Sequence, residues 1–124
     1  MRYIYNKLVR DKIPHQINNE QGRKANYKIL SDEQYIKELD KKLFEEAHEF
    51  IEEYSVEELG DLMEVIFTIM EIKNISMQQV EEARRIKENK KGGFKDKIYL
   101  IDVEQEHADE REEMELNKEW RKNS

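Results

Sequence analysis

The chain contains no cysteine, one proline and four glycines in 124 residues. Without cysteine it can form neither disulfide bonds nor thiolate metal sites. No apolar run reaches the roughly 20 residues that a transmembrane helix needs, because charged and hydroxyl side chains interrupt the longest one, residues 62–72. The first ten residues lack the hydrophobic stretch of a signal peptide. These absences predict a cytoplasmic protein that does not enter a membrane.

Charged residues make up 41% of the chain, and hydrophobic residues make up 37%. This balance fits long amphipathic helices better than a thick sheet core, and it predicts a mainly all-α fold. Length and even composition indicate one domain. We place it over residues 1–103, followed by a charged C-terminal helix or tail over residues 104–124.

The net charge of −7 argues against binding to a nucleic-acid polymer. The charges are unevenly distributed, since residues 31–71 hold 14 acids and 3 bases, whereas residues 84–97 hold 7 bases and 2 acids. An acidic cluster that recruits a divalent cation, with a basic segment elsewhere in the chain, is what a metal–polyphosphate ligand needs.

Serine-led capping signatures predict where three helices begin. A serine followed three residues later by glutamine or glutamate occurs at Ser31, Ser55 and Ser76. The predicted helices run from residue 31 to about 54, from about 56, and from about 77 to a stop at glycine 92. A short extended piece and a short helix should precede them. Residues 26–30 and 94–103 allow a short two-stranded β element.

The predicted helix over residues 31–54 has an acidic residue at the edge of its apolar stripe. At about 100° per residue, six apolar side chains lie within roughly 60° of Ile36, and Glu46 falls at the border of this stripe. Glu49 follows at about 220°, and Glu45 points to the far side of the helix.

In the next helix, Glu58 lies on the apolar face itself. Four apolar residues fall within about 40° of it, and Asp61 comes at about 300°. Two carboxylates on an apolar face are unfavourable unless they are neutralised, paired or bound to a metal. A cation is the simplest remedy, and Mg²⁺ suits the site because it prefers carboxylate oxygens and keeps positions for water and phosphate. The Glu58 carboxylate then either contributes to both the helix cap and the metal site, or binds the metal alone.

The acidic residues form the pattern EExxE at residues 45–49 followed by ExxD at residues 58–61. The chain also contains YNKLVRDKIP at residues 5–14 and KGGF at residues 91–94. In this order the motifs resemble the MazG-like all-α nucleoside triphosphate pyrophosphohydrolases. The second motif is similar to an N-terminal block of a small MazG-like subfamily, and the third to its Arg-Gly-Gly-Phe turn. Lys91 replaces the arginine of that turn, which removes a bidentate contact.

The resemblance implies an antiparallel helical bundle that uses Mg²⁺, or alternatively Mn²⁺, to cleave a nucleoside triphosphate into monophosphate and pyrophosphate. It assigns the metal-ligand role to Glu46, Glu49, Glu58 and Asp61. It leaves Glu45 as a group outside the ligands or as a base that orients water. The basic residues expected to neutralise the leaving pyrophosphate are Lys7, Arg10, Lys12, Lys87 and Lys91.

The predicted second helix is apolar over more than half of its circumference. Met63, Phe67 and Met70 extend the apolar surface beyond the side that carries Glu58 and Asp61. One neighbouring helix cannot cover so wide a face, so we expect self-association. The resemblance implies a homodimer or a homotetramer.

Two other functions compete with this interpretation. Glu45-x-x-His48 and Glu104-x-x-His107 match the ligand spacing of di-iron carboxylate bundles, but His48 falls at about 120°, off the apolar stripe on which such ligands must lie. The other alternative is a nucleotide sensor or a protein-interaction module that keeps the metal cluster without turnover. Release of pyrophosphate or phosphate across a nucleotide panel separates these possibilities.

Overall fold

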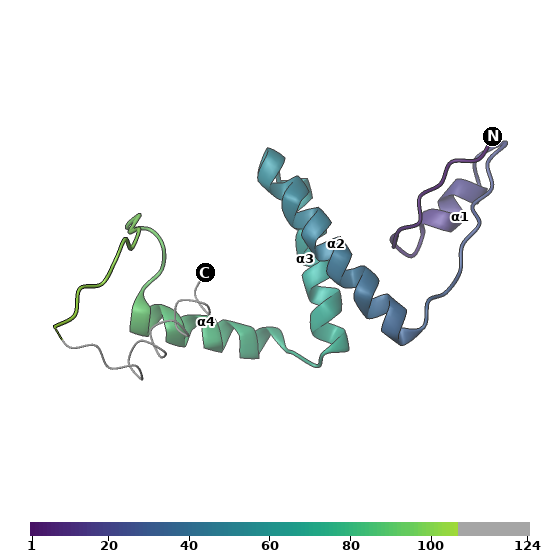
Figure 1. The fold of residues 1–124 in the computed structure, drawn as a ribbon. Helices are drawn as coiled ribbons and strands as arrows, with labels where there is room; N and C mark the ends of the chain where they lie inside the picture. Colours follow the sequence, from purple (N-terminus) through teal and green to yellow (C-terminus); the bar gives the residue numbers. More distant parts are fainter. Residues whose placement is uncertain (107–124) are drawn as a thin grey trace. The chain divides into compact units, whose positions relative to one another are not determined.

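The computed structural model describes residues 1–106, whose regular structure is entirely helical (Figure 1). Its helices are α1 (Ile13–Asn18), α2 (Asp32–Glu53), α3 (Val56–Ile72) and α4 (Met77–Lys91). The all-α class is therefore confirmed. Residues 1–106 contain no β-strand, and the two-stranded element expected from residues 26–30 and 94–103 is not confirmed, since both segments lie outside the helices.

Helices α2 and α4 begin at the serines that the sequence indicated. The Ser31 hydroxyl accepts a hydrogen bond from the backbone N–H of Gln34 at 3.3 Å, and the Ser31 N–H donates to Gln34 Oε1 at 3.4 Å. Ser76 and Gln79 exchange the same two bonds: the Ser76 hydroxyl accepts from the Gln79 N–H at 3.1 Å, and the Ser76 N–H donates to Gln79 Oε1 at 2.9 Å. Each capping box satisfies backbone N–H groups that the first turn of a helix leaves without partners.

Only two residues connect α2 to α3, and the two helices pack side by side in opposite directions (Figure 1). Tyr54 reverses the chain, because its backbone adopts the left-handed conformation with φ 51° and ψ 34°. Its N–H donates to the carbonyl oxygen of Phe50, and the two rings meet edge to face with centroids 5.3 Å apart. The left-handed conformation costs roughly 1–2 kcal/mol for a residue with a Cβ. The turn brings the last turns of α2 against the first turns of α3.

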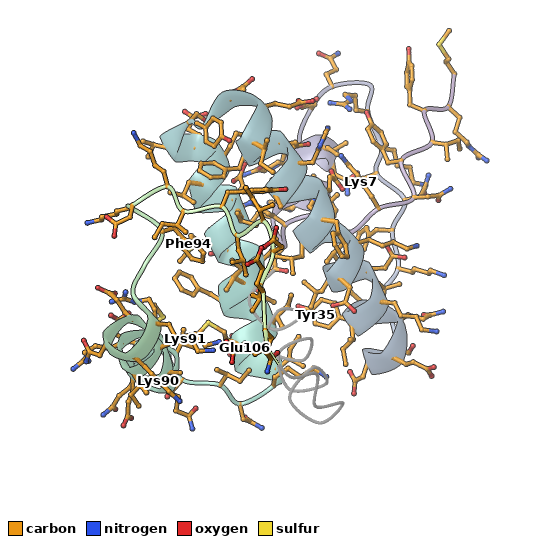
Figure 2. All side chains as sticks on the ribbon, turned by 60° about the vertical axis from the view of Figure 1, so that its left-hand side comes forward. Lys7, Tyr35, Lys90, Lys91, Phe94 and Glu106 are labelled. Atoms are coloured by element: carbon orange, nitrogen blue, oxygen red, sulfur yellow. The ribbon has the colours of Figure 1, made fainter. Side chains whose placement is uncertain are left out.

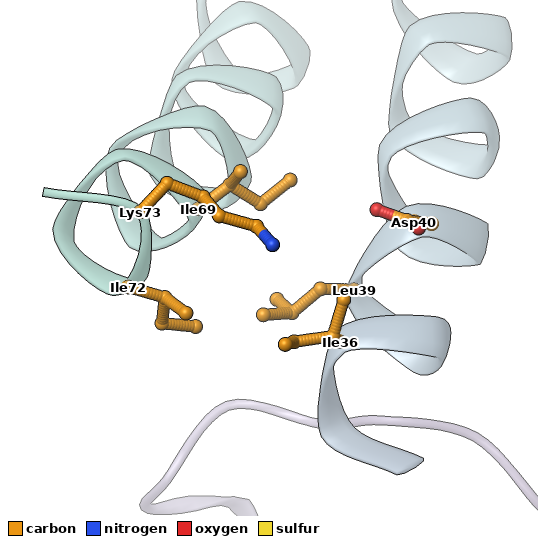
Figure 3. Close-up of a pocket in the computed structure, with 6 residues that line it drawn as sticks. All are labelled: Ile36, Leu39, Asp40, Ile69, Ile72 and Lys73. Carbon is orange, nitrogen blue, oxygen red and sulfur yellow. The ribbon is translucent and has the colours of Figure 1, made fainter. Parts of the chain in front are cut away.

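The interface between α2 and α3 has a thin apolar core. Among residues 1–106 the only buried apolar side chains are Leu39 and Val65, which are 4% and 8% exposed. Leu39 lines a cavity of about 10 Å³ together with Ile36, Ile69 and Ile72 (Figure 3). Full burial of one such side chain contributes about 1.5–3 kcal/mol. The hairpin thus gains little stability from its interior.

Large apolar side chains remain exposed on both helices of the hairpin. Phe44 on α2 is 78% exposed, and Phe67 on α3 is 43% exposed. Within the described part of the chain, α2 and α3 are the only helices that contact each other. The antiparallel bundle expected from the sequence stays a prediction, because the hairpin supplies only two of its helices.

The chain divides into two compact units, residues 1–86 and the residues from Lys87 onward. The domain boundary predicted after residue 103 stays a prediction, and the helix or tail expected over 104–124 lies outside the described residues from position 107 on. In the second unit α4 ends as predicted before Gly92, whose φ of 83° is left-handed. The side chain of Phe94 beyond it is exposed (Figure 2). None of the helices in residues 1–106 is both long and apolar enough to cross a bilayer.

Candidate metal centre

Three carboxylates from α2 and α3 converge beside the turn that joins the two helices. One oxygen from each of Glu46, Glu58 and Asp61 lies within 4.8 Å of the others. Glu46 belongs to the second half of α2, whereas Glu58 and Asp61 belong to the first two turns of α3. Because the connection is so short, residues that are 12 to 15 positions apart in the sequence face each other across the hairpin.

Two oxygens of this cluster are buried without a hydrogen-bond partner. Glu46 is only 6% exposed, and its Oε2 atom finds no partner among the described residues. The Oε2 atom of the half-buried Glu58 is in the same situation. A buried carboxylate oxygen without a partner is unfavourable, and the large majority of buried polar atoms in proteins are paired. Two such atoms in one cluster of hard oxygens fit a divalent cation such as Mg²⁺ or Mn²⁺.

The burial of these carboxylates and their closeness to one another also affect their protonation. Burial raises the pKa of Glu46 above its ordinary value, the nearby Glu49 carboxylate raises it further, and Lys42 opposes the change. Burial also raises the pKa of Glu58, with Glu49 and Asp61 adding to the effect. Both shifts indicate that the folded hairpin disfavours the charged carboxylates, which a bound cation would stabilise.

Lys42 is the one basic residue of α2 that touches the cluster. Its Nζ atom lies 3.5 Å from an oxygen of Glu46 and 3.5 Å from an oxygen of Glu45. One ammonium group cannot neutralise the whole set of carboxylates. Lys42 was not predicted as part of the site, although its spacing of four residues from Glu46 is the spacing at which helical side chains meet. Glu45 reaches the cluster only through Lys42.

Arg10 approaches the cluster from the N-terminal segment. Its Nη2 atom donates a hydrogen bond to Asp61 Oδ1 at 2.8 Å, across a separation of 51 residues. The structure thus brings the Arg10 guanidinium to a predicted metal ligand, and the role of Arg10 toward the leaving pyrophosphate stays a prediction.

The fourth predicted ligand, Glu49, lies beside the cluster but outside the set whose oxygens come within 4.8 Å of one another. Its proximity is evident from its effects, since its negative charge raises the pKa of both Glu46 and Glu58. The structure thus brings together three of the predicted ligands, with the fourth next to them.

The predicted lysines are not part of this cluster of carboxylates. Lys7 is exposed in the N-terminal segment of the same unit (Figure 2). Lys12 is exposed immediately before α1. Lys87 and Lys91 belong to the second unit, where both are exposed at the end of α4. Their role toward a phosphate ligand stays a prediction.

The histidine required by the di-iron alternative does not join the carboxylates. His48 is exposed on α2, with its Nε2 atom 3.1 Å from an oxygen of Glu52. His107, the second histidine of that pattern, lies outside the described residues. The geometry of His48 agrees with its position off the apolar stripe and gives the di-iron interpretation no support.

Comparison with protein-family models, with curated proteins and with solved structures gives no match to this chain.

Proposed function

We propose that the chain is a Mg²⁺-dependent nucleoside triphosphate pyrophosphohydrolase, which cleaves NTP or dNTP to the monophosphate and pyrophosphate. The observation that carries the proposal is the convergence of Glu46, Glu58 and Asp61 with two buried oxygens that lack partners. The motifs that resemble the MazG-like enzymes supply the reaction. The cluster by itself supports a cation site only.

In this proposal Glu46, Glu58 and Asp61 hold the cation, and Glu49 completes the set. When bound, Mg²⁺ polarises phosphoryl oxygens and lowers the pKa of a coordinated water. Glu46 is buried and Glu58 is half-buried. Their charges are therefore weakly screened by water and attract a cation more strongly than exposed carboxylates would. Lys42 keeps the Glu46 carboxylate in place.

The role proposed for Glu45 is to position Lys42. A base that orients water must lie within hydrogen-bond reach of the reacting groups. Glu45 instead pairs with the Lys42 ammonium, which also contacts Glu46. The geometry therefore supports the alternative in which Glu45 stands outside the ligands.

Basic residues would bind the phosphates of the substrate in this proposal. Lys7 and Arg10 lie on the same N-terminal segment, and Arg10 already reaches the cluster through Asp61. Charge-assisted hydrogen bonds from such residues stabilise the charge that develops on a leaving pyrophosphate. Lys87 and Lys91 are candidates for the same role only through the resemblance to the MazG-like enzymes.

Self-association as a homodimer or homotetramer is part of the proposal. The hairpin has a core of two buried apolar side chains within residues 1–106, and large side chains such as Phe67 remain exposed on α3. A second hairpin packed on this face would complete an antiparallel four-helix arrangement and cover the apolar surface.

The test is the identity of the products. Purified protein is incubated with a panel of nucleoside and deoxynucleoside triphosphates in Mg²⁺ or in EDTA, and products are separated by ion-exchange chromatography. Monophosphate plus pyrophosphate, formed only with Mg²⁺, supports the proposal. Diphosphate plus phosphate indicates a different class of enzyme. Nucleotide binding with Mg²⁺ and no product of either kind supports the sensor alternative.

A further inference from the structure

The contact between Arg10 and Asp61 differs from the other ion pairs of its region. In residues 1–76 every other ion pair joins residues three or four positions apart on the chain. Arg10 lies before α1, in a segment without helix, and its guanidinium reaches α3. The contact therefore ties the N-terminal segment to the carboxylate cluster.

The position of this contact matters because Asp61 shares its cluster with Glu46 and Glu58. A guanidinium next to three carboxylates offsets part of their mutual repulsion. A divalent cation held by the same carboxylates would carry a like charge only a few ångströms from the guanidinium. The two cations repel each other at this distance, and both compete for the negative charge of the Asp61 carboxylate.

We infer that Arg10 is a built-in competitor of the divalent cation, whose guanidinium neutralises Asp61 until an ion displaces it. The inference rests on the proposed function, because it presupposes that the cluster binds a cation. It adds a regulatory contact to that site, in which the N-terminal segment is released when the ion enters.

The geometry suits an exchangeable contact. The side chains of Arg10 and Asp61 are 59% and 43% exposed, and a single hydrogen bond joins them. Exposed ion pairs of this kind are weak, because water screens the charges and the long side chain loses freedom. A bound cation can therefore break the pair, after which the guanidinium is available for a phosphate oxygen. A triphosphate that takes up the released Arg10 would make binding of the cation and the nucleotide mutually reinforcing.

A binding experiment with Mn²⁺ tests the competition directly. Wild type, Arg10→Gln and Arg10→Lys are titrated with Mn²⁺ by calorimetry in the absence of nucleotide. Arg23→Gln is the matched control, since Arg23 forms an exposed ion pair with Glu20 and does not touch the cluster. Arg10→Gln should bind Mn²⁺ about two- to fivefold more tightly, the factor that corresponds to an exposed ion pair. Arg10→Lys, which retains the charge, should stay near wild type, and Arg23→Gln should be unchanged.

A decrease in the Mn²⁺ affinity of Arg10→Gln would indicate that Arg10 supports the metal site. If Arg10 instead held Asp61 in its ligating orientation, Arg10→Gln would weaken Mn²⁺ binding. Weaker or unchanged binding by Arg10→Gln overturns the competition but leaves the metal site standing. Absence of Mn²⁺ binding by both wild type and Arg10→Gln removes the metal site and the inference together.

A second measurement uses only the wild-type chain and is independent of any effect of substitution on folding. An arginine-selective dicarbonyl reagent is applied with and without Mg²⁺, and modified peptides are quantified by mass spectrometry. Mg²⁺ should accelerate modification of Arg10 and leave modification of Arg23 unchanged. An equal or slower rate at Arg10 in saturating Mg²⁺ contradicts the release of the guanidinium.

Discussion

The backbone N–H of Glu58 donates to the Ser55 hydroxyl at 3.1 Å, but the Glu58 carboxylate returns no hydrogen bond to the Ser55 N–H within the described part of the chain. The capping boxes of α2 and α4 have glutamine in the equivalent position, and both are complete. The glutamate instead belongs to the cluster with Glu46 and Asp61. Its carboxylate is thus available to a cation at the expense of a complete helix cap.

This contrast predicts the behaviour of Glu58→Gln. A neutral amide can complete the capping box, and it removes the repulsion among the clustered carboxylates, so the variant should melt at a higher temperature than wild type in EDTA. It should also lose the stabilisation by Mg²⁺, which for wild type approaches about 2.7 kcal/mol when the ion reaches 100 times its Kd. Thermal melts with and without Mg²⁺ measure both effects.

Glu57→Gln is the matched control for that substitution. Glu57 neighbours Glu58 in the first turn of α3 but is exposed and outside the cluster. It should retain the Mg²⁺-dependent rise in melting temperature. The interpretation fails if Glu58→Gln keeps the full response to Mg²⁺, or if Glu57→Gln loses it.

The raised pKa values of Glu46 and Glu58 predict a pH dependence of stability. The folded chain holds these protons more tightly than the unfolded chain, so the free energy of unfolding in EDTA should fall as pH rises from about 4.3, the ordinary glutamate value, through the raised values. Saturating Mg²⁺ should reduce this decline, because it pairs with the ionised carboxylates. Urea unfolding across this range measures the slope.

Two variants distinguish the contribution of the cluster to this pH dependence from the contribution of other titrating groups. Glu46→Gln removes one of the shifted carboxyls and should show a smaller decline with pH than Glu57→Gln does. Equal slopes for the two variants would mean that the buried carboxylate of Glu46 does not control the dependence.

The helices and part of the site could be predicted from local patterns. A serine cap acts within one turn, so Ser31, Ser55 and Ser76 were sufficient to predict where the three long helices begin. The angles of Glu58 and Asp61 depend only on helical periodicity, which predicted that both would lie together on the inner side of α3. Glu46 followed from the same reasoning applied to α2.

The remaining features depend on the tertiary structure. The ion pair of Arg10 with Asp61 spans 51 residues, and no local period encodes it. The expected strands at residues 26–30 and 94–103 required a partner strand, because strand preference depends on packing against neighbours more than on the segment itself. Glu49 falls between the two cases, since its angle predicted a place near Glu46 but not its exact distance.

The exposed face of α3 predicts the effect of Phe67→Glu. If a second copy covers this face, burial of a charge there is unfavourable, and the variant should dissociate at concentrations where wild type is a dimer or tetramer. Sedimentation velocity at micromolar concentration measures the change. Lys37→Gln on the exposed side of α2 alters the net charge by the same amount and should leave assembly intact. A folded wild-type monomer at this concentration contradicts the prediction.

Asp61→Asn should remove most of the Mg²⁺-dependent hydrolysis. The substitution retains the shape of the side chain but removes a ligand charge beside Glu46 and Glu58. Loss of groups that merely support metal ligands reduces affinity or activity by 10- to 100-fold, so loss of a ligand should lower Mg²⁺-dependent pyrophosphate release by at least about 100-fold. Asp40→Asn is the control, because Asp40 is exposed on α2 and outside the cluster. Circular dichroism should show equal helix content in both variants. If Asp61→Asn hydrolyses nucleotides at the rate of wild type with its helices intact, the cluster does not carry the reaction.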